Sequence, residues 1–571
     1  MRMLFRYLRP YLTLMTSSIS MKFIGSLVEL LIPYVLSYII DDVVPKKSVP
    51  QITFWGGIML LCAIIALVTN ILANRMAAKV ARNTTQAIRH DLFSKISYLS
   101  CRQIDEFSIP SLEARLTTDT YYIHQFIGTM QRLGIRAPIL LLGGIVVTLT
   151  LDPVLALVLI ATLPLIGGLT FYISRKGIPL YTRTQNAVDV LVRTVRENIT
   201  GIRVTKALSK TEYEKDRFAG VNAEVVRREK KAGMTMALTN PLMNLFLNLG
   251  LTGVILVGAY RVNAGTSQTG AIIAFLTYFT IILNAMLSIT RMFNIYSRGS
   301  ASASRVSKVL EAPEEMAAER LPKTEASCHV AFDHVTFSYL KGEHNLEDIS
   351  FSLKKGETLG ILGATGSGKS TLIHLLMRLY DPDKGEIRIQ GENIRSIPPE
   401  KLHTMFGIVF QNDILFADTI AANIDFGRGL PREWIEKAAE DAQAMEFIHG
   451  LADGFDHMLT PKGTNLSGGQ KQRLLVARAL AGKPEILVLD DSSSALDYKT
   501  DSQLRQALSK DFGGTTTIIV AQRISSLKHA DHILVLDEGK TLGYGTHEEL
   551  LKSCKIYRQI SQSQMGGDSV A

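Results

Sequence analysis

The sequence predicts two parts, an all-α transmembrane domain of six helices and an α/β domain that follows it. The 571 residues have a mean hydropathy of +0.16 and only 20% of them are charged, values typical of a chain with much of its length in a membrane. Six apolar runs lie within the first 292 residues. A polar segment separates them from a region that alternates like strands and then becomes periodic like helices.

The composition excludes several classes of protein. Glycine at 43 residues, proline at 18 and cysteine at 4 exclude collagen-like, disordered and disulfide-scaffold chains. The cysteines lie far apart without a CxxC pair, which indicates thiols in a reducing compartment. The 62 basic and 53 acidic residues give a net charge of +9, which suits nucleic acid, an anionic membrane surface or a sided topology. The distribution of the charge therefore has to decide its meaning.

Each apolar run is long enough for a membrane span, because a bilayer core about 30 Å thick needs about 20 mostly apolar residues per helix. The third run is short unless it extends back through Gly128, and Asp152-Pro153 leaves room only for a tight hairpin before the fourth. An amphipathic segment at residues 1–12 predicts an interfacial elbow helix rather than a cleaved signal peptide. The runs cover approximately residues 17–40, 54–74, 136–151, 153–173, 241–262 and 270–292.

Basic residues between the spans predict the orientation. Residues 75–132 and 175–231 are rich in Lys and Arg, whereas the opposite loops hold only Lys46, Lys47 and Arg261. The positive-inside rule therefore predicts that both long segments and both termini are cytoplasmic, in a multi-pass protein of the cytoplasmic membrane. The positive charge then indicates sidedness and not nucleic acid.

The two long segments are periodic and should continue the spanning helices into the cytoplasm. Their breaks, at residues 105–111 and 198–201, are turned tips suited to contact a cytoplasmic domain; a solvated hairpin without a partner is the alternative. Within the spans, Glu29 is the deepest ionisable residue, and it has either a substrate or proton role or a structural ion pair in the bundle. The other polar residues in the spans are Lys22, Arg136, Asn244, Asn248, Asn284 and Arg291.

These patterns predict a transmembrane domain at 13–300, a linker at 301–326, an α/β domain at 327–562 and a flexible tail at 563–571. In the α/β domain, Gly363 to Ser370 reads GATGSGKS and lies between a strand and a helix. This is the GxxxxGKS loop in the context that its chemistry requires. The glycines let backbone N–H groups surround phosphates, and the helix N-terminus adds its dipole. Lys369 is expected to reach the β and γ phosphates, and Ser370 to bind Mg²⁺.

Three further elements complete the candidate site. The apolar strand 486–489 ends in Asp490, a carboxylate suited to orient Mg²⁺ through water. Gln411 lies between this strand and the glycine loop in sequence. Leu466 to Arg473 reads LSGGQKQR and opens a helix, so Ser467 and the glycines offer a hydroxyl and backbone groups to an anion.

The order of these motifs, followed by Ser494-Ala495-Leu496-Asp497, resembles the nucleotide-binding domain of ATP-binding-cassette (ABC) proteins, in which LSGGQ is the highly specific element. Six preceding spans with cytoplasmic extensions resemble the exporter branch, the type IV fold. The resemblance covers essentially the whole chain. It implies a dimer that sandwiches two ATP molecules, each between the Walker A loop of one subunit and the LSGGQ of the other, with the two breaks as coupling helices. It also implies that Tyr339 stacks on adenine; an ordinary strand aromatic is the alternative.

Two departures from the family pattern change the prediction. Asp490 matches the family's Walker B Asp. Exporters with a competent site carry Glu directly after that Asp, whereas this chain has Asp491, and Gln522 stands in place of the switch histidine. Drift at either position is possible by itself, but both changes beside an intact LSGGQ look systematic. We therefore predict a hydrolytically weak site on this chain's own Walker motifs and a heterodimer whose partner supplies the Glu and His. A third departure, Thr460-Pro461 in place of the usual GE pair, leaves the signalling role of that loop open.

The predicted function is ATP-driven, multidrug-type export of amphipathic small molecules by one subunit of a heterodimeric transporter in contact with membrane lipids. A lipid or peptide exporter, a homodimer with reduced ATPase, and an ABC-type channel or regulatory subunit are the alternatives; a nucleic-acid ATPase is disfavoured by the six spans. The cofactors are ATP and Mg²⁺. The predicted catalytic residues are Asp491, Gln522 and Gln411, the metal residues Ser370, Gln411 and Asp490, and the nucleotide residues Tyr339, Gly363, Thr365, Gly366, Ser367, Gly368, Lys369, Ser370, Thr371, Ser467, Gly468, Gly469, Gln470 and Asp497.

Overall fold

The computed structural model describes residues 2–323, 325, 327–339, 344–411, 413–492 and 496–565. The chain divides into two compact units. One consists of Met1–Ile96 with Pro110–Ala312, and the other of Ser97–Ile109 with Pro313–Ala571. The second unit thus contains the tip of a helical extension as well as the α/β domain. Each unit is described by itself.

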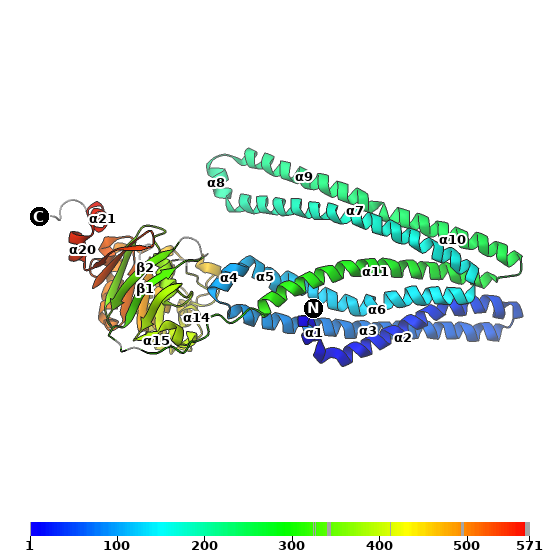
Figure 1. Cartoon of the computed structure of the whole chain (residues 1–571), viewed down its shortest axis with the longest axis horizontal. Coiled ribbons are helices and arrows are strands. Elements are labelled where there is room, and N and C mark those ends of the chain that lie inside the picture. The colour runs from blue at the N-terminus through cyan, green and yellow to red at the C-terminus, as the bar shows by residue number, and fades with distance from the viewer. Residues whose placement is uncertain are drawn as a thin grey trace. The chain divides into compact units, whose positions relative to one another are not determined.

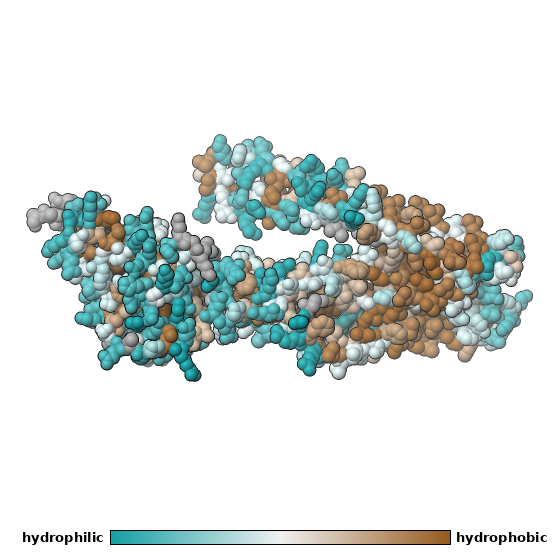
Figure 2. All heavy atoms as spheres, viewed as in Figure 1, coloured by the Kyte–Doolittle hydropathy of each residue, from teal (hydrophilic) through white to brown (hydrophobic). Residues whose placement is uncertain are grey.

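The first unit is all helical. Six helical runs among the described residues are long and apolar enough to cross a membrane, which confirms the six predicted spans. Their apolar residues form a band across this unit, with polar residues at the helix ends on one side of the band and over the long extensions on the other (Figure 2). The helices are α1 (Arg2–Leu8), α2 (Leu12–Tyr38), α3 (Val49–Ser97), α5 (Ile109–Ala114), α6 (Thr120–Leu151), α7 (Pro153–Thr200), α8 (Ile202–Ala207), α9 (Thr211–Ala237), α10 (Thr239–Asn263) and α11 (Thr269–Leu310).

The third span and its connection to the fourth are as the sequence predicts. Helix α6 begins at Thr120, so the short third run does extend back through Gly128. Asp152 alone separates α6 from α7, and its carboxylate caps α7 by accepting from the backbone N–H groups of Val154 and Leu155 at 2.9 and 3.2 Å. Beyond the membrane-spanning segments, α7 and α9 pack along each other and are joined through the short helix α8 (Figure 1). Helix α7 continues to Thr200, so only Gly201 of the predicted second break interrupts the helices.

Helices α6 and α11 pack antiparallel over most of their length because small residues let the two backbones approach. A Cβ atom built on Gly299 would lie 2.4 Å from Cβ of Phe126, and one built on Gly144 would lie 2.8 Å from Cγ1 of Ile282. At the same seam, Asp119 accepts a hydrogen bond from Ser302 and pairs with Arg305. These contacts therefore hold α11 against α6 both within the membrane-spanning segments and in the extension beyond them.

Gly299→Val is expected to destabilise the helical unit, since even the added Cβ would overlap Phe126 and overpacking costs about 1–3 kcal/mol. The apparent melting temperature in detergent should fall by several degrees. Gly233→Ala on α9 is the matched control, because nothing lies within 4 Å of the position of its added Cβ. Equal melting temperatures for both variants would contradict this close approach of α6 and α11.

Three of the polar residues of the spans, Lys22, Glu29 and Arg136, have partners inside the bundle. Arg136 pairs with Glu29 through two hydrogen bonds, of 3.2 Å from Nε and 2.6 Å from an Nη. Lys22, which is buried, donates to the side chains of Asn70 at 2.7 Å and Asn74 at 3.1 Å. Glu29 therefore forms the ion pair that its structural interpretation requires. A role of Glu29 in substrate or proton binding stays a prediction.

The predicted linker is wrong over its first part. Residues 301–310 are helical and complete α11, because Ala303, Val306 and Val309 recur at three-residue spacing and are buried. The Ser/Ala-rich composition conceals this apolar stripe. After Leu310, the contacts that hold the chain within the second unit include a hydrogen bond from Glu319 N to the carbonyl of Arg395 and one from Arg378 to the carbonyl of Ala317.

The first predicted break is also more structured than expected. A short helix α4 (Cys101–Phe107) occupies part of it, and Ser100 caps α4 through a capping box with Gln103. The chain leaves helical geometry before α4 and again at Ser108, whose φ is 62°. At the other end of the chain, α21 (Lys555–Met565) continues into the predicted tail, so residues 563–565 are helical. The predicted residues 566–571 lie outside the described part.

The second unit contains two sheets. An antiparallel sheet has the strand order β2-β1-β4-β5, and a larger sheet has the order β10-β9-β3-β8-β7-β6, parallel except at β10. The strands are β1 (Val330–Phe337), β2 (Leu346–Leu353), β3 (Thr358–Gly363), β4 (Lys384–Ile389), β5 (Glu392–Asn393), β6 (Phe406–Val409), β7 (Ile486–Asp490), β8 (Thr516–Val520), β9 (His532–Asp537) and β10 (Lys540–Gly545).

The core of this unit lies between the sheets and their helices. Because β3, β6, β7 and β8 are parallel, their carboxyl ends meet at one edge, where an α/β sheet places its ligand site. The remaining helices are α12 (Lys369–Leu376), α13 (Pro399–Thr404), α14 (Ile420–Asp425), α15 (Arg432–Asp441), α16 (Met445–His449), α17 (Gly468–Ala481), α18 (Tyr498–Asp511), α19 (Ile524–Leu527) and α20 (His547–Ser553).

Candidate nucleotide site

A pocket of about 240 Å³ opens at this edge of the parallel sheet. It collects the glycine loop after β3, the segment after β6, and the residues that follow β7 and β8. Ten of the predicted site residues lie in its wall, together with Asn345, Val520 and Ala521, which the motifs do not identify. The ten are Thr365, Gly366, Gly368, Lys369, Ser370, Thr371, Gln411, Asp490, Asp491 and Gln522.

The glycine loop needs its glycines for conformation and for space. Gly366 and Gly368 have φ of +86° and +98°, a region that side chains rarely adopt. A Cβ on Gly363, at the end of β3, would lie 2.4 Å from the carbonyl oxygen of Leu536. Lys369 Nζ donates to the loop carbonyls of Gly363 at 2.9 Å and Ala364 at 2.6 Å. The lysine charge is thus held over the loop at the N-terminus of α12, where phosphates bind.

The oxygen atoms expected to serve a metal lie together. Ser370 Oγ donates to Asp490 Oδ2 at 3.0 Å, and Gln411 lines the same pocket. Burial raises the pKa of Asp490, and the hydrogen bond from Ser370 opposes that shift. Hydroxyl, carboxylate and amide oxygens are the hard ligands that Mg²⁺ takes, usually with waters and substrate phosphates completing its shell. This set of a hydroxyl, a carboxylate and an amide therefore fits Mg²⁺. A different kind of metal site, built from three or more His, Cys, Asp or Glu side chains, does not occur among the described residues.

The two residues that depart from the family pattern contact each other. Gln522 Nε2 donates to Asp491 Oδ2 at 3.4 Å. Burial raises the pKa of Asp491, while the positive charges of Lys369 and Arg523 act in the opposite direction. Asp491 takes a left-handed backbone conformation with φ of 50° directly after β7, which directs the chain out of the sheet. Both residues line the same pocket as Lys369 and Ser370.

The LSGGQ segment is folded as a helix cap. Ser467 Oγ accepts from the backbone N–H of Gln470, whose side chain accepts from Ser467 N at 2.9 Å. Gly468 and Gly469 form the first turn of α17. These four residues are not among those that line the phosphate pocket, so this chain does not bring its own Walker A loop and LSGGQ together.

Asp497 caps the next helix, α18, by accepting from Thr500 N at 2.9 Å, and this contact lowers its pKa. Ser494 and Ala495 of the same predicted motif lie outside the described residues. Thr460 and Pro461, which replace the family's GE pair, lie in a compact turn. Thr460 Oγ1 contacts Asn465 Oδ1 at 3.0 Å and Thr464 Oγ1 at 2.8 Å.

Tyr339 lies beside the phosphate pocket rather than in its wall. Its hydroxyl contacts His374 Nδ1 at 3.1 Å and Thr371 Oγ1 at 3.3 Å. Its ring meets the rings of Phe337 and Tyr380 edge to face, at centroid distances of 4.9 and 5.0 Å. Neither His374 nor Tyr380 carries a motif that would identify it from the sequence.

Tyr380 joins this aromatic cluster to α4 within the second unit. Its hydroxyl donates to Asp105 Oδ2 at 2.6 Å across 275 positions of sequence. Burial, followed by the contact with Asp105, raises the pKa of Tyr380, so the hydroxyl stays protonated and remains a donor. Ser100 and Gln103 add contacts to Glu315 Oε2 at 2.7 Å and the carbonyl of Pro313 at 2.9 Å.

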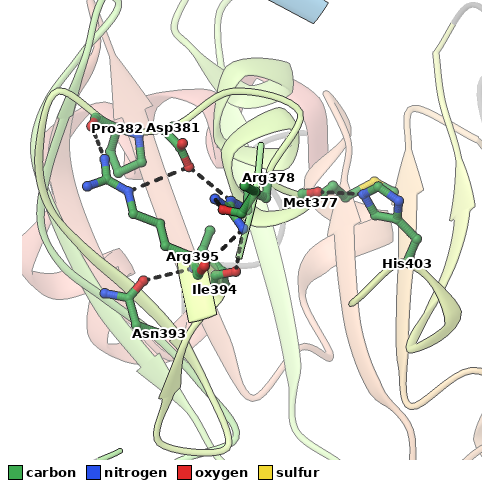
Figure 3. Close-up of polar contacts among 9 residues, drawn as sticks. Met377, Arg378, Asp381, Pro382, Asn393, Ile394, Arg395 and His403 are labelled. Atoms are coloured by element: carbon green, nitrogen blue, oxygen red, sulfur yellow. Dashed lines mark hydrogen bonds and ion pairs between the residues drawn. The ribbon is translucent and has the colours of Figure 1, made fainter. Parts of the chain in front are cut away.

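The α12 helix of the glycine loop ends at a second anchor, Arg378, which is buried and has φ of 52° (Figure 3). Its guanidinium donates to Asp381 Oδ1 at 3.2 Å, to the carbonyl of Arg395 at 3.0 Å and to that of Ala317 at 3.1 Å. Arg378 therefore ties the segment after Leu310 to the end of the helix whose other end holds the glycine loop.

Tyr380→Phe is expected to loosen α4, because it removes a hydrogen bond to a charged group, worth about 1.5–3 kcal/mol. Amide hydrogen exchange of residues 101–107 should become about tenfold faster or more, since 1.4 kcal/mol corresponds to a factor of ten. Tyr498→Phe is the control, because the Tyr498 side chain is exposed. Unchanged exchange in Tyr380→Phe would show that this contact does not anchor α4.

The comparisons with known proteins agree with this architecture. Residues 15–286 match the family model of the ABC transporter transmembrane region, and residues 346–494 match the family model described as ABC transporter. The chain is 35% identical over 562 residues to YfiB of Bacillus subtilis, an uncharacterized ABC transporter ATP-binding protein, with 98% of each chain covered. Rv1273c of Mycobacterium tuberculosis, described in the same words, is 33% identical, with 98% of this chain and 97% of that protein covered.

A solved structure is similar in fold. A bacterial Atm1-family ABC exporter with ATP bound aligns with a TM-score of 0.82 at 24% identity, covering 98% of this chain and 99% of that one. At this identity the likeness concerns the fold alone.

Proposed function

This chain belongs to the ABC transporters as an exporter half-transporter that hydrolyses ATP, and from that premise we propose that it is the weak-site subunit of a heterodimer. The observation that carries the proposal is the contact of Asp491 with Gln522 in the phosphate pocket, beside an LSGGQ segment that keeps every residue of its motif. Nucleotide binding and nucleotide hydrolysis are thus separated on this chain. Its own Walker motifs bind, and its Ser467 to Gln470 complete the partner's competent site.

The weakness has a geometric cause. The Asp491 carboxylate is one methylene shorter than that of Glu, which draws it about 1.5 Å back, and catalytic groups are sensitive to displacements of about 1 Å. Gln522 donates a hydrogen bond but cannot carry the charge of a histidine. Gln522 also donates a hydrogen bond to Asp491, so these two side chains bind each other rather than water or phosphate. Water at the γ-phosphate would therefore meet a poorly placed base.

The binding function keeps all its parts. Lys369 and the loop amides hold the phosphates, and Tyr339 offers its ring to the adenine. Ser370, Asp490 and Gln411 are the residues that would hold Mg²⁺, which when bound neutralises phosphate charge. These assignments predict a site that retains ATP while hydrolysis takes place at the partner's site.

In the membrane, we place both termini and the α/β domain on the cytoplasmic side, since basic residues concentrate in the extensions. Closure of the two nucleotide domains on ATP would draw α4 and α8 of each subunit together and favour an outward-open cavity. The spans with their scattered asparagines suit amphipathic small molecules. Export of a lipid or a peptide by the same cycle is the alternative substrate class.

The test is purification of the chain with and without its native partner. The pair should show substrate-stimulated ATPase, and the homodimer should be at least about tenfold slower, a barrier difference of about 1.4 kcal/mol. Nucleotide trapping in a single turnover should label the two sites of the pair unequally. A homodimer that hydrolyses ATP as fast as the pair would instead support a symmetric exporter.

A further inference from the structure

Two polar cavities lie along the contact between α6 and α11 in the helical unit, the second of them also lined by Glu29 of α2, and together we call them the polar groove. One cavity in it has a volume of about 240 Å³ and is lined by Tyr122, Gln125, Arg291, Asn294, Ile295 and Arg298. A second, of about 110 Å³, lies further along the same two helices, and its polar lining is Glu29, Arg136, Asn284 and Ser288. The two cavities follow one another in sequence on both helices, from the apolar span toward the cytoplasmic extension.

One face of α11 supplies most of the groove. Asn284, Ser288, Arg291, Asn294 and Arg298 follow each other at steps of four, three, three and four residues, which keeps them on one side of an α-helix. Neighbouring residues of the same helix, such as Leu283 and Gly299, are buried in the bundle and line neither cavity. The polar stripe is therefore a feature of the helix register and continues past the apolar span.

The two arginines of the larger cavity differ from those arginines of this unit that form ion pairs. Arg136, Arg261 and Arg305 each pair with a carboxylate. Within the described part of the chain, Arg291 contacts only Ser288 Oγ, at 3.3 Å, and Arg298 lies 5.8 Å from the ring centroid of Tyr122; neither has a carboxylate partner.

Both guanidiniums are exposed at the mouth of the groove, seven positions apart on one face. A guanidinium presents a planar fork of donors that matches a carboxylate, sulfonate or phosphate. The amides of Gln125 and Asn294 add donors beside them.

We propose that this groove binds the anionic group of an amphipathic organic anion, and that such anions are the molecules exported. The proposal rests on the exporter function above and narrows its substrate class. Arg291 and Arg298 hold the anionic group, while Tyr122 and Ile295 contact the apolar body. The Glu29–Arg136 pair is neutral as a unit, so it lines the deeper cavity without repelling the anion. The phosphate of an anionic membrane lipid offers the same chemistry, and the experiment must separate the two sources.

The test uses the full-length chain with its co-purified partner in phosphatidylcholine nanodiscs without nucleotide. Fluorescence anisotropy measures binding of carboxyfluorescein, an anion, and of rhodamine 6G, a cation with a related ring system. Carboxyfluorescein should bind more tightly, and Arg291→Gln with Arg298→Gln should raise its Kd at least about tenfold, since hydrogen bonds to charged groups are lost. The Lys double variant should retain binding within about threefold, because it keeps the charge. Lys308→Gln, which removes an exposed charge of α11 outside the groove, is the matched control.

Three results would overturn the proposal. The first is a Kd for carboxyfluorescein that the double Gln variant leaves unchanged. The second is preferential binding of rhodamine 6G. The third is loss of dye binding in nanodiscs containing phosphatidylglycerol together with no ATP-dependent uptake of carboxyfluorescein into inverted vesicles, which would assign the groove to a resident lipid. Binding is measured without ATP, so it does not depend on which site hydrolyses. Failure of the proposed function would appear separately, as equal ATPase of the homodimer and the pair.

Discussion

Asp491→Glu combined with Gln522→His is expected to raise ATP turnover at this chain's own site by about 10- to 100-fold, which corresponds to about 1.4–2.7 kcal/mol of barrier. The longer side chain returns the carboxylate to the reach of the attacking water, and the histidine restores a group that can carry charge beside the γ-phosphate. The replacement also removes the contact of 3.4 Å that now joins the two side chains. The measurement is steady-state ATPase of the purified homodimer, in which both sites use these motifs.

Each single substitution should give much less than the double one, because the two groups act on the same water and phosphate. Lys369→Ala in the double-variant background is the control, since it removes the phosphate contact and should return turnover to the background. Turnover that stays at the wild-type level in the double variant would mean that Asp491 and Gln522 do not limit this site. The heterodimer would then lose its main support.

The sequence predicted the parts that depend on local patterns. The spans could be predicted because each is a run of apolar residues, and the glycine loop because its spacing is tied to phosphate binding. The predicted linker begins at residue 301, whereas α11 continues to Leu310. The reason is that the apolar stripe through Ala303, Val306 and Val309 lies within a Ser-rich stretch that resembles a linker. Apolar residues at three-residue spacing are weak evidence of a helix when their side chains are as small as Ala and Val.

Contacts that join distant segments could not be predicted. The Tyr380–Asp105 hydrogen bond spans 275 positions, and neither residue belongs to a motif. Arg378 is a similar case, because a basic residue at the end of a helix usually faces solvent, whereas this one is buried by its hydrogen bonds to Asp381 and the carbonyls of Arg395 and Ala317. Such residues are specified by the tertiary fold. They connect the glycine-loop helix and the aromatic cluster to α4 and to the segment after α11.

Gly468→Asp is expected to reduce steady-state ATPase of the pair at least about 100-fold, or about 2.7 kcal/mol, because it places a negative charge where the LSGGQ segment meets the γ-phosphate of the partner's site. The fold should tolerate this change. Gly468 is exposed at the first position of α17, where an acidic residue interacts favourably with the helix dipole. The loss would thus come from repulsion of the nucleotide and not from unfolding.

The comparison with Lys369→Ala makes this prediction specific to an asymmetric pair. In the proposed pair, that variant weakens the site to which we assign slow hydrolysis, so it should lower steady-state ATPase of the pair no more than about threefold. Gly468→Ala, which adds a methyl group without charge, should fall between wild type and Gly468→Asp. If the two sites were equivalent, Lys369→Ala and Gly468→Asp would impair the pair to a similar extent. A large loss confined to Gly468→Asp therefore distinguishes hydrolysis at the partner's site from hydrolysis shared by both.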